Sequence, residues 1–390
     1  MAESLPLSHD KLLFTPGPLT TSLAVKAAML HDAGSWHFEF SEIVRGIRQK
    51  LLAIAGVSEE KGYESILMQG SGTFAVESVV GSAVPPNGKL LVLVNGAYGE
   101  RMLQMATRLK INTAMLRCPE NQRHDLTALA ATLAADPAIT HVAAVHCETT
   151  TGILNLIEDI GRIAKDRGCV YVVDAMSSFG AIPIDAAETG IDFLVASANK
   201  CLEGVPGFGF VIAKRSELLA IDGFARSVSL DLLGQWKGFQ KNGQFRFTPP
   251  THAILAFEQA LREFDAEGGT LGRAARYQTN HRTLVEGMKR LGFHIYLEPD
   301  VQSYIITSFY YPTQANFRFA EFYRRLSEKG MIIYPGKLSQ VDCFRIGNIG
   351  RIFEADIRCL LNAIEQTLTE MNVSLDTAVE LSGQIGDTAD

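Results

Sequence analysis

A glycine-rich segment, Gly70-Ser71-Gly72-Thr73, lies between a short apolar run and a stretch of helical period (74–84). Glycines at a strand-to-helix turn let backbone N–H groups approach an anion, and the helix N-terminus adds a favourable field. Ser71 and Thr73 add hydroxyl donors. Such a turn is also common between a strand and a helix, so a phosphate site and a plain turn both remain open for this segment alone.

A carboxylate, Asp174, ends the apolar run Val170–Val173. Ligands of open α/β sheets bind outside the carboxyl ends of the strands, which makes an acid at this place a candidate ligand residue. An aspartate at a strand end is also a routine helix cap. Asp174 alone leaves both interpretations open.

A lysine, Lys200, follows the next apolar run, Phe193–Ala196, and two small residues. If the two strands are neighbours, the amine and the carboxylate of Asp174 converge on one crevice. An apolar setting suits a Schiff-base lysine, because desolvation lowers its pKa and frees the neutral nucleophile. The alternative is a surface lysine in a loop, where most lysines lie.

The three segments together match the needs of pyridoxal 5′-phosphate (PLP). This cofactor needs an anion site for its phosphate, a lysine that condenses with its aldehyde and an acid that keeps the ring nitrogen protonated. We therefore expect PLP as cofactor, with Lys200 and Asp174 as the catalytic residues. Lys200 is placed to move a proton at the substrate's α-carbon.

Short motifs along the chain resemble those of class V, fold-type I aminotransferases, which use PLP. The resemblance covers about residues 10–370, and the lysine segment and the segment near the C-terminus are its most specific parts. The motifs are TPGP (15–18), GSGT (70–73), NGAYG (95–99), ETTTG (148–152), DAMSSFG (174–180), SANKCLEGVPG (197–207), FRFTPPTH (245–252) and YPGKLSQVDCFRIGNIG (334–350).

The resemblance implies further cofactor-binding residues. Tyr98 would stack on the pyridine ring, although ordinary helix packing is the plainer interpretation of this tyrosine. Thr149 would form a hydrogen bond near the phenolic oxygen of the cofactor, unless it only caps a loop. Ser71, Gly72 and Thr73 would hold the phosphate.

The resemblance also implies a homodimer with shared active sites. Family members place residues of the partner subunit at the phosphate, which here points to Arg246 and Thr248. Arg246 has the alternative of being one more surface base.

Arg345 lies where the wider family has an arginine that binds the substrate carboxylate. A guanidinium offers a bidentate fork to planar or tetrahedral oxyanions, so one arginine can serve two different substrates. A structural ion pair is the alternative. Gly17, in the loop Pro16–Pro18, would line the same pocket.

The implied reaction moves the amino group of 2-aminoethylphosphonate to pyruvate, giving phosphonoacetaldehyde and L-alanine. One position departs from the expected motif, because His37 follows Trp36 where relatives have an aspartate. A modified aminophosphonate is therefore an alternative donor. An alanine–glyoxylate or serine–glyoxylate type aminotransferase, a binding protein without catalysis and an unrelated nucleotide-binding domain are the other hypotheses.

Short apolar runs alternate with helical segments through the first two thirds of the chain, which predicts an α/β fold with a largely parallel sheet. Several runs are apolar on both faces, as where helices cover both sides of a sheet. The resemblance implies a seven-stranded sheet flanked by helices. The expected strands are 66–69, 90–94, 141–146, 170–174, 193–196 and 207–213, with a helix at 98–109.

The composition changes after about residue 265, so we expect two domains. Residues 20–265 form a large PLP-binding domain, and residues 1–19 with 266–371 form a smaller α+β domain. Residues 372–390 are polar and acidic, which predicts a flexible tail. The expected elements of the smaller domain are strand-like runs at 294–297 and 303–309 and helices at 317–329 and 355–371.

The composition excludes several classes of protein. The 390 residues include 36 Lys and Arg against 43 Asp and Glu, and this mild acidity argues against nucleic-acid and membrane-surface partners. No apolar run reaches the length of about 18 residues that a membrane span needs. The six cysteines lack CxxC spacing, which argues against a metal site or a disulfide framework. Reduced thiols and the absence of an apolar leader lead us to expect a cytoplasmic protein.

Overall fold

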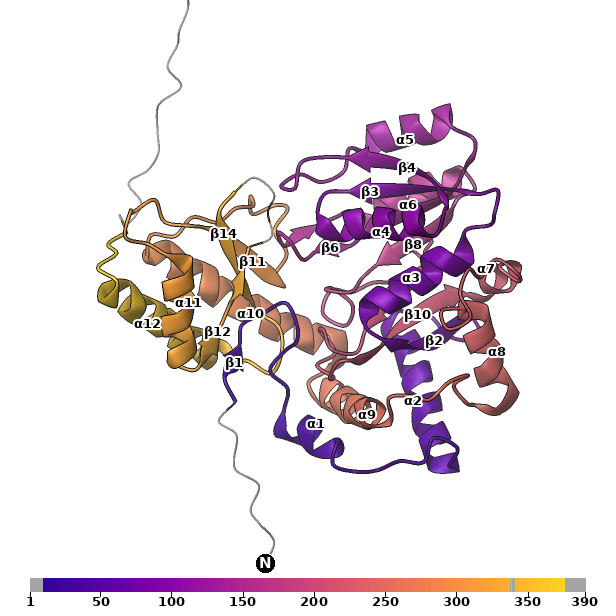
Figure 1. Cartoon of the computed structure of the whole chain (residues 1–390), viewed down its shortest axis with the longest axis horizontal. Coiled ribbons are helices and arrows are strands. Elements are labelled where there is room, and N and C mark those ends of the chain that lie inside the picture. The colour runs from indigo at the N-terminus through magenta and orange to yellow at the C-terminus, as the bar shows by residue number, and fades with distance from the viewer. Residues whose placement is uncertain (1–9, 337, 339–340, 376–390) are drawn as a thin grey trace, which may run out of the picture.

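A seven-stranded sheet runs through the larger part of the molecule (Figure 1). The structure is a computed structural model and describes residues 10–336, 338 and 341–375. All neighbouring strands are parallel except β10, which is antiparallel to both of its neighbours. The expected α/β fold with a mostly parallel sheet is therefore confirmed. In sheet order the strands are β2 (Tyr63–Gly70), β10 (Gly207–Lys214), β9 (Phe193–Ser197), β8 (Val170–Asp174), β5 (Ile139–Val145), β3 (Lys89–Val94) and β4 (Asn112–Arg117).

Helices cover both faces of this sheet, and nearly every residue of β8, β9 and β10 is buried as a result. The strands and the helices that pack on them share one large hydrophobic cluster. The two-residue strands β6 (Cys147–Glu148) and β7 (Ile153–Leu154) form a small hairpin after β5. The helices are α1 (Leu23–Ala28), α2 (Phe38–Ile54), α3 (Gly72–Ala83), α4 (Ala97–Arg108), α5 (Leu126–Ala135), α6 (Ile157–Asp166), α7 (Arg215–Ala220), α8 (Leu232–Asn242) and α9 (Thr251–Ala266).

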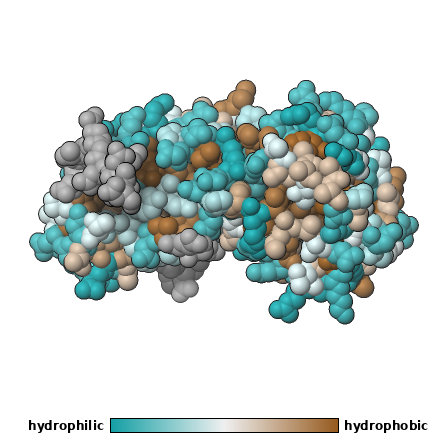
Figure 2. Space-filling model, turned by 90° about the horizontal axis from the view of Figure 1, so that it is seen from above, coloured by the Kyte–Doolittle hydropathy of each residue, from teal (hydrophilic) through white to brown (hydrophobic). Residues whose placement is uncertain are grey.

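The molecule has a second lobe beside the seven-stranded sheet (Figures 1 and 2). This lobe has its own hydrophobic cluster, which is rich in buried phenylalanine residues. The N-terminal segment belongs to this lobe, because Phe14 is buried in its cluster and β1 pairs with β12. These contacts support the proposed division into two domains. The elements of this lobe are β1 (Leu12–Leu13), α10 (Gly269–Arg290), β11 (Ile306–Tyr310), α11 (Phe319–Glu328), β12 (Met331–Ile332), β13 (Tyr334–Pro335), β14 (Cys343–Gly347) and α12 (Glu354–Glu370).

The proposed flexible tail (372–390) lies outside the described residues from residue 376 onward. Within its first four residues, Val373 is buried in the cluster of the smaller lobe, and the side-chain amide of Asn316 donates to the carbonyls of Met371 and Asn372.

Most of the expected elements are confirmed with small shifts at their ends. Strand β4 was not among the expected strands. It is an edge strand of exposed and half-buried residues, so it lacks the continuous apolar run of the inner strands. The expected strand at 294–297 is wrong. This segment makes only an isolated antiparallel bridge between Ile295 and Phe309, because its backbone bonds to β11 are limited to those from Tyr296 to Ser308 and from Tyr310 to His294.

None of the described helices is long and apolar enough to cross a membrane. The described residues also contain no group of three or more His, Cys, Asp or Glu side chains placed to hold a metal ion.

Candidate active site

The strands β8 and β9 are neighbours, and both end at the same edge of the sheet. Asp174 is the last residue of β8 and pairs with Val195 of β9, while Lys200 follows the end of β9. The positive charge of Lys200 is close enough to Asp174 to lower the pKa of that carboxyl group. The structure therefore brings the two proposed catalytic side chains together at the edge where ligands of such sheets bind.

The carboxyl group of Asp174 is buried and accepts one hydrogen bond of 2.9 Å, from the backbone N–H of Met176 to Oδ1. Burial raises its pKa to about 6, against the opposing effects of that hydrogen bond and of the charges of Arg101 and Lys200. Among the described residues, no basic side chain forms an ion pair with it at 4 Å or less. A buried carboxyl group that has no ion-pair partner is stabilised in its ionised form by a cationic ligand group beside it. A protonated ring nitrogen is such a group.

The segment 70–73 forms the turn between β2 and α3, as the motif predicts. Ser71 occupies the N-cap position of α3, yet its hydroxyl makes no capping hydrogen bond and is free for a ligand. Gly72 and Thr73 begin the helix, where backbone N–H groups lack intrahelical acceptors and attract anions. A side chain at Gly72 would collide with the thioether of Met176. The turn fits a phosphate group.

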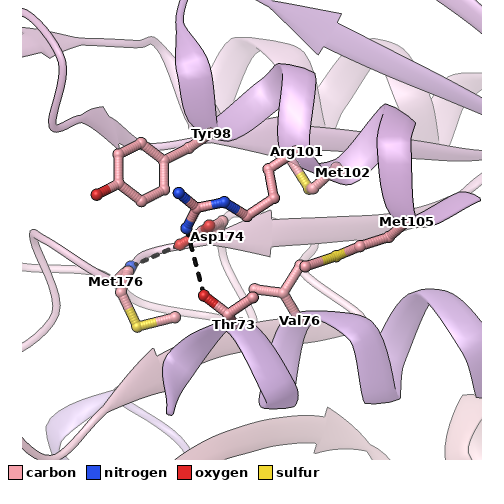
Figure 3. Close-up of a pocket in the computed structure, with 8 residues that line it drawn as sticks. All are labelled: Thr73, Val76, Tyr98, Arg101, Met102, Met105, Asp174 and Met176. Carbon is pink, nitrogen blue, oxygen red and sulfur yellow. Dashed lines mark hydrogen bonds between the residues drawn. The ribbon is translucent and has the colours of Figure 1, made fainter. Parts of the chain in front are cut away.

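A small cavity beside Asp174 connects this turn with the carboxylate (Figure 3). Arg101 reaches across it, donating to the Thr73 hydroxyl at 3.3 Å and lying 4.7 Å above the centre of the Tyr98 ring. The sequence analysis did not select Arg101, because a charged residue on an amphipathic helix normally faces water. Arg101 lies three residues after Tyr98 and therefore on the same helix face, and this spacing could have identified it as a residue of the site.

Thr149 contacts both lobes at the site. Its hydroxyl shares a hydrogen bond of 2.6 Å with Ser177, a residue that the sequence analysis did not select although it lies within the DAMSSFG motif. Its carbonyl accepts a hydrogen bond of 2.8 Å from Nη1 of Arg345 on β14. Arg345 is buried and also donates to the carbonyl of Pro335 at 3.0 Å, and burial lowers its pKa. Both acceptors are neutral, so its positive charge suits an incoming anion.

The N-terminal loop passes directly over Lys200. The amine of Lys200 donates to the carbonyl of Pro16 at 2.6 Å. Gly17 has a φ of +120°, which glycine adopts readily and other residues do not. A Cβ atom at this position would lie 2.5 Å from Nζ of Lys200. Gly17 is thus required by both its backbone conformation and its contact with the lysine.

The contacts within one chain do not bring Arg246 to Asp174 and Lys200. Its guanidinium donates to the carbonyl of Val228 at 3.1 Å and to Asp231 at 3.2 Å. Thr248 lies nearer to the site, because Gln69 at the end of β2 donates to its carbonyl at 3.4 Å. The role of both residues in a partner subunit stays a prediction.

His37, the position that departs from the expected motif, lies at the N-cap of α2. Its exposed ring nitrogen Nδ1 is 3.8 Å from the carboxylate of Glu39. Its effect on substrate choice also stays a prediction.

The comparison with protein families decides the classification. The model of the family described as aminotransferase class-V matches residues 21–340. The chain belongs to the class V aminotransferase family. Membership implies PLP as the cofactor, and the buried acid, the helix N-terminus and the lysine described above fit it.

Individual relatives agree with this family. The class V chain is 53% identical over 363 residues to 2-aminoethylphosphonate–pyruvate transaminases of Salmonella typhimurium and Salmonella schwarzengrund, with 93% of this chain and 98% of each relative covered. Among solved structures, ureidoglycine–glyoxylate aminotransferase from Bacillus subtilis matches with a TM-score of 0.86 at 20% identity, covering 96% of both chains. Alanine–glyoxylate aminotransferase from Nostoc sp. matches with a TM-score of 0.84 at 25% identity, covering 94% of this chain and 97% of that one.

The first prediction concerns the loop over the lysine. Gly17→Ala places a methyl group against Nζ of Lys200 and strains the backbone, so we expect aminotransferase turnover to fall by about tenfold or more. The control is Gly223→Ala, since Gly223 has a φ of +83° and no atom within 4 Å of the added methyl group. Steady-state kinetics on both folded variants makes the comparison. Equal activity of the two variants would show that contact with the lysine is irrelevant.

The second prediction concerns the pH dependence of stability in the cofactor-free protein. The pKa of Asp174 is about 6 in the folded state and about 3.9 in an unfolded chain. Between these values the folded state holds a proton that the unfolded state has lost, so the free energy of unfolding falls as pH rises, by about 3 kcal/mol in all. Asp174→Asn removes the titrating group, so this fall in the free energy of unfolding should be absent from the variant. Urea denaturation of the wild type and the variant between about pH 4 and pH 8 measures both free energies. A difference between the two proteins that stays constant across this range would contradict the prediction.

Proposed function

We propose that this class V aminotransferase transfers the amino group of 2-aminoethylphosphonate to pyruvate, giving phosphonoacetaldehyde and L-alanine in phosphonate degradation. The observation that carries the proposal is the 53% identity, over 93% of this chain and 98% of the relative, to a protein named for this reaction. The geometry around Lys200, Asp174 and Arg345 supports it, because it supplies a nucleophilic amine, a buried acid and an anion-binding cation within one site.

PLP, when bound, supplies an aldehyde that condenses with amines and a ring that withdraws electrons from the carbon next to the nitrogen. Lys200 would hold the cofactor through its amine. Its amine, when not engaged with the cofactor, would move a proton at the substrate carbon that bears nitrogen. The hydrogen bond from Lys200 to the carbonyl of Pro16 supports this role, because the N-terminal loop would limit where the amine can lie.

Asp174 maintains the charge that this chemistry needs. Its burial makes an ionised carboxylate unfavourable unless a cation lies beside it, so the acid and a protonated ring nitrogen stabilise each other. Ser71, Gly72 and Thr73 would hold the phosphate at the N-terminus of α3, with Arg101 beside Thr73 as an additional cation. Tyr98 would stack on the pyridine ring.

Arg345 would bind the anionic end of each substrate. A transaminase receives its two substrates in turn, and here one carries a phosphonate and the other a carboxylate. A guanidinium donates to either group through two parallel N–H bonds. Because Arg345 donates to the carbonyl of Thr149, the anion would lie next to the residue proposed to contact the phenolic oxygen of the cofactor.

We infer that the enzyme is a homodimer whose partner subunit contributes Arg246 and Thr248 at the phosphate. Two exposed aromatic side chains support this arrangement. Phe74 directly follows the phosphate turn and is 51% exposed, and Phe247, between Arg246 and Thr248, is 45% exposed. Such rings are normally covered, and an interface between two copies would cover both. Other large hydrophobic side chains are exposed on α1, in the loop before α2 and at the start of α2: Leu23, Leu30, Trp36 and Phe38.

None of the six cysteines, all of which lie in the described part of the chain, forms a disulfide bond, and Cys147, Cys169, Cys201 and Cys343 are buried. Cysteines without disulfide bonds are typical of proteins in a reducing compartment, and we propose a cytoplasmic location.

The third prediction tests the reaction. With the PLP-loaded enzyme and pyruvate as acceptor, 2-aminoethylphosphonate should react at least about tenfold faster than simple amino acids, and faster than L-alanine reacts with glyoxylate. Arg345→Gln should raise KM for both substrates by about tenfold or more, because a charge-assisted hydrogen bond contributes about 1.5–3 kcal/mol. Chromatographic detection of L-alanine and phosphonoacetaldehyde measures turnover.

The matched control for this test is Arg324→Gln, which removes an exposed guanidinium paired with Glu328 in the same lobe and should leave KM unchanged. Rapid turnover of L-alanine with glyoxylate, without reaction of 2-aminoethylphosphonate, would favour the alanine–glyoxylate alternative and contradict the proposal.

A further inference from the structure

The turn that carries Lys200 contains a strained residue. Glu203 has a φ of +60°, in the left-handed region that side chains other than those of Gly, Asn and Asp rarely adopt. Its N–H donates to the carbonyl of Lys200 at 2.7 Å, and the next N–H, of Gly204, returns to Ala198 at 2.9 Å. Strain of this kind persists only where surrounding contacts hold it. The other non-glycine residues with positive φ among those described, Lys110 and Asn372, directly follow helix ends.

The side chain of Glu203 supplies those contacts. It is only 2% exposed, and its Oε1 accepts hydrogen bonds from Arg276 at 2.7 Å and from the hydroxyl of Tyr277 at 2.6 Å. Arg273 lies 3.4 Å from the same oxygen and also donates to the carbonyl of Cys201, the residue directly after Lys200. Both the backbone and the side chain of this turn are therefore held by helix α10.

A second carboxylate balances the charge of this cluster. Glu267 accepts hydrogen bonds from Nε of Arg273 at 2.7 Å and from Nε of Arg276 at 2.5 Å. Burial lowers the pKa of Arg273, but the electrostatic effects of Tyr277, Glu203 and Glu267 together outweigh it, and the pKa of Arg273 is raised. Two guanidinium groups and two carboxylates compensate one another, so loss of either carboxylate leaves an excess positive charge beside the lysine turn.

The same cluster extends to the strand that carries the substrate-binding arginine. Arg276 donates to the carbonyls of Gly350 at 2.6 Å and Ile352 at 3.0 Å, and the Tyr277 hydroxyl accepts from the N–H of Gly350 at 3.0 Å. This segment follows β14, on which Arg345 lies. The lysine turn and the substrate-binding strand therefore share one buried anchor.

We propose that Glu203 is a positioning residue for Lys200. Its carboxylate, held by Arg273, Arg276 and Tyr277, keeps the strained turn in the conformation that directs the lysine amine to its reaction partner, and links this turn to the segment after β14. The inference rests on the proposed PLP chemistry of Lys200. It does not depend on which amino donor the enzyme uses.

The fourth prediction tests this role with two substitutions in the PLP-loaded enzyme. Glu203→Gln keeps the shape of the side chain and removes its charge, while Glu203→Gly removes the side chain and relieves the strain at φ +60°. We expect kcat to fall by about tenfold or more in both, with KM changed by less than about threefold, because a misplaced amine slows proton transfer rather than binding. The excess positive charge also shifts the absorbance titration of the lysine-bound cofactor to lower pH.

The matched control is Glu64→Gln. Glu64 is an equally buried carboxylate between Arg48 and Arg215, but it lies near the start of β2, at the opposite end of this strand from the phosphate turn. This variant should lose stability without a change in kcat or in the titration midpoint. If Glu203→Gln does not fold, Glu203→Gly alone tests the positioning role, since removing the strain at this position favours a folded variant.

Wild-type kcat and an unchanged titration midpoint in Glu203→Gly would overturn the inference, because the side chain would then have only a structural role. Equal changes in the Glu64→Gln control would overturn it as well. Failure of the proposed function has a different signature, namely a wild-type enzyme that does not use 2-aminoethylphosphonate while the spectroscopic difference between wild type and the Glu203 variants persists.

Discussion

A carboxyl group buried at the end of a strand is unfavourable in its ionised form unless a positive charge lies beside it. Asp174 is such a group, and its pKa of about 6 expresses the cost of removing it from water. The parallel arrangement of β8 and β9 places Lys200 at the same edge of the sheet. The other proposed roles in the site follow from the proposal that a charged ring lies between these two side chains.

Several elements of both lobes surround Asp174 and Lys200 and contact the space between them from different sides. The N-terminus of α3 offers backbone N–H groups that would bind an anion on one side, and α4 contributes Tyr98 and Arg101 beside it. The N-terminal loop covers the lysine through the carbonyl of Pro16, and the smaller lobe contributes Arg345, which reaches back to Thr149.

Much of the fold could be predicted from the sequence, because buried strands of a parallel sheet are apolar on both faces and leave continuous hydrophobic runs. The exposed strand β4 has no such run and was missed. Asp174, Lys200 and the 70–73 turn were recognisable for the same reason, since each lies at the carboxyl end of a predicted strand or within a few residues of it, and topology places such residues at one edge.

Other features depend on packing between distant segments and leave no local signal. Arg101 resembles an exposed helical charge until α4 is placed against α3, where it meets Thr73. The left-handed conformation of Glu203 and its contacts with α10 join residues more than seventy positions apart, which no local periodicity reports. The contact of Arg345 with Thr149 likewise appears only when the two lobes are together.

The most direct test of the central claim is chemical identification of the lysine that binds the cofactor. PLP-treated protein is reduced with borohydride, digested and analysed by mass spectrometry, with Lys200→Ala as the reference. The account predicts one pyridoxyl-phosphate label, on Lys200, that is absent from the variant. An unlabelled Lys200, or a label on another lysine that persists in the variant, would contradict it.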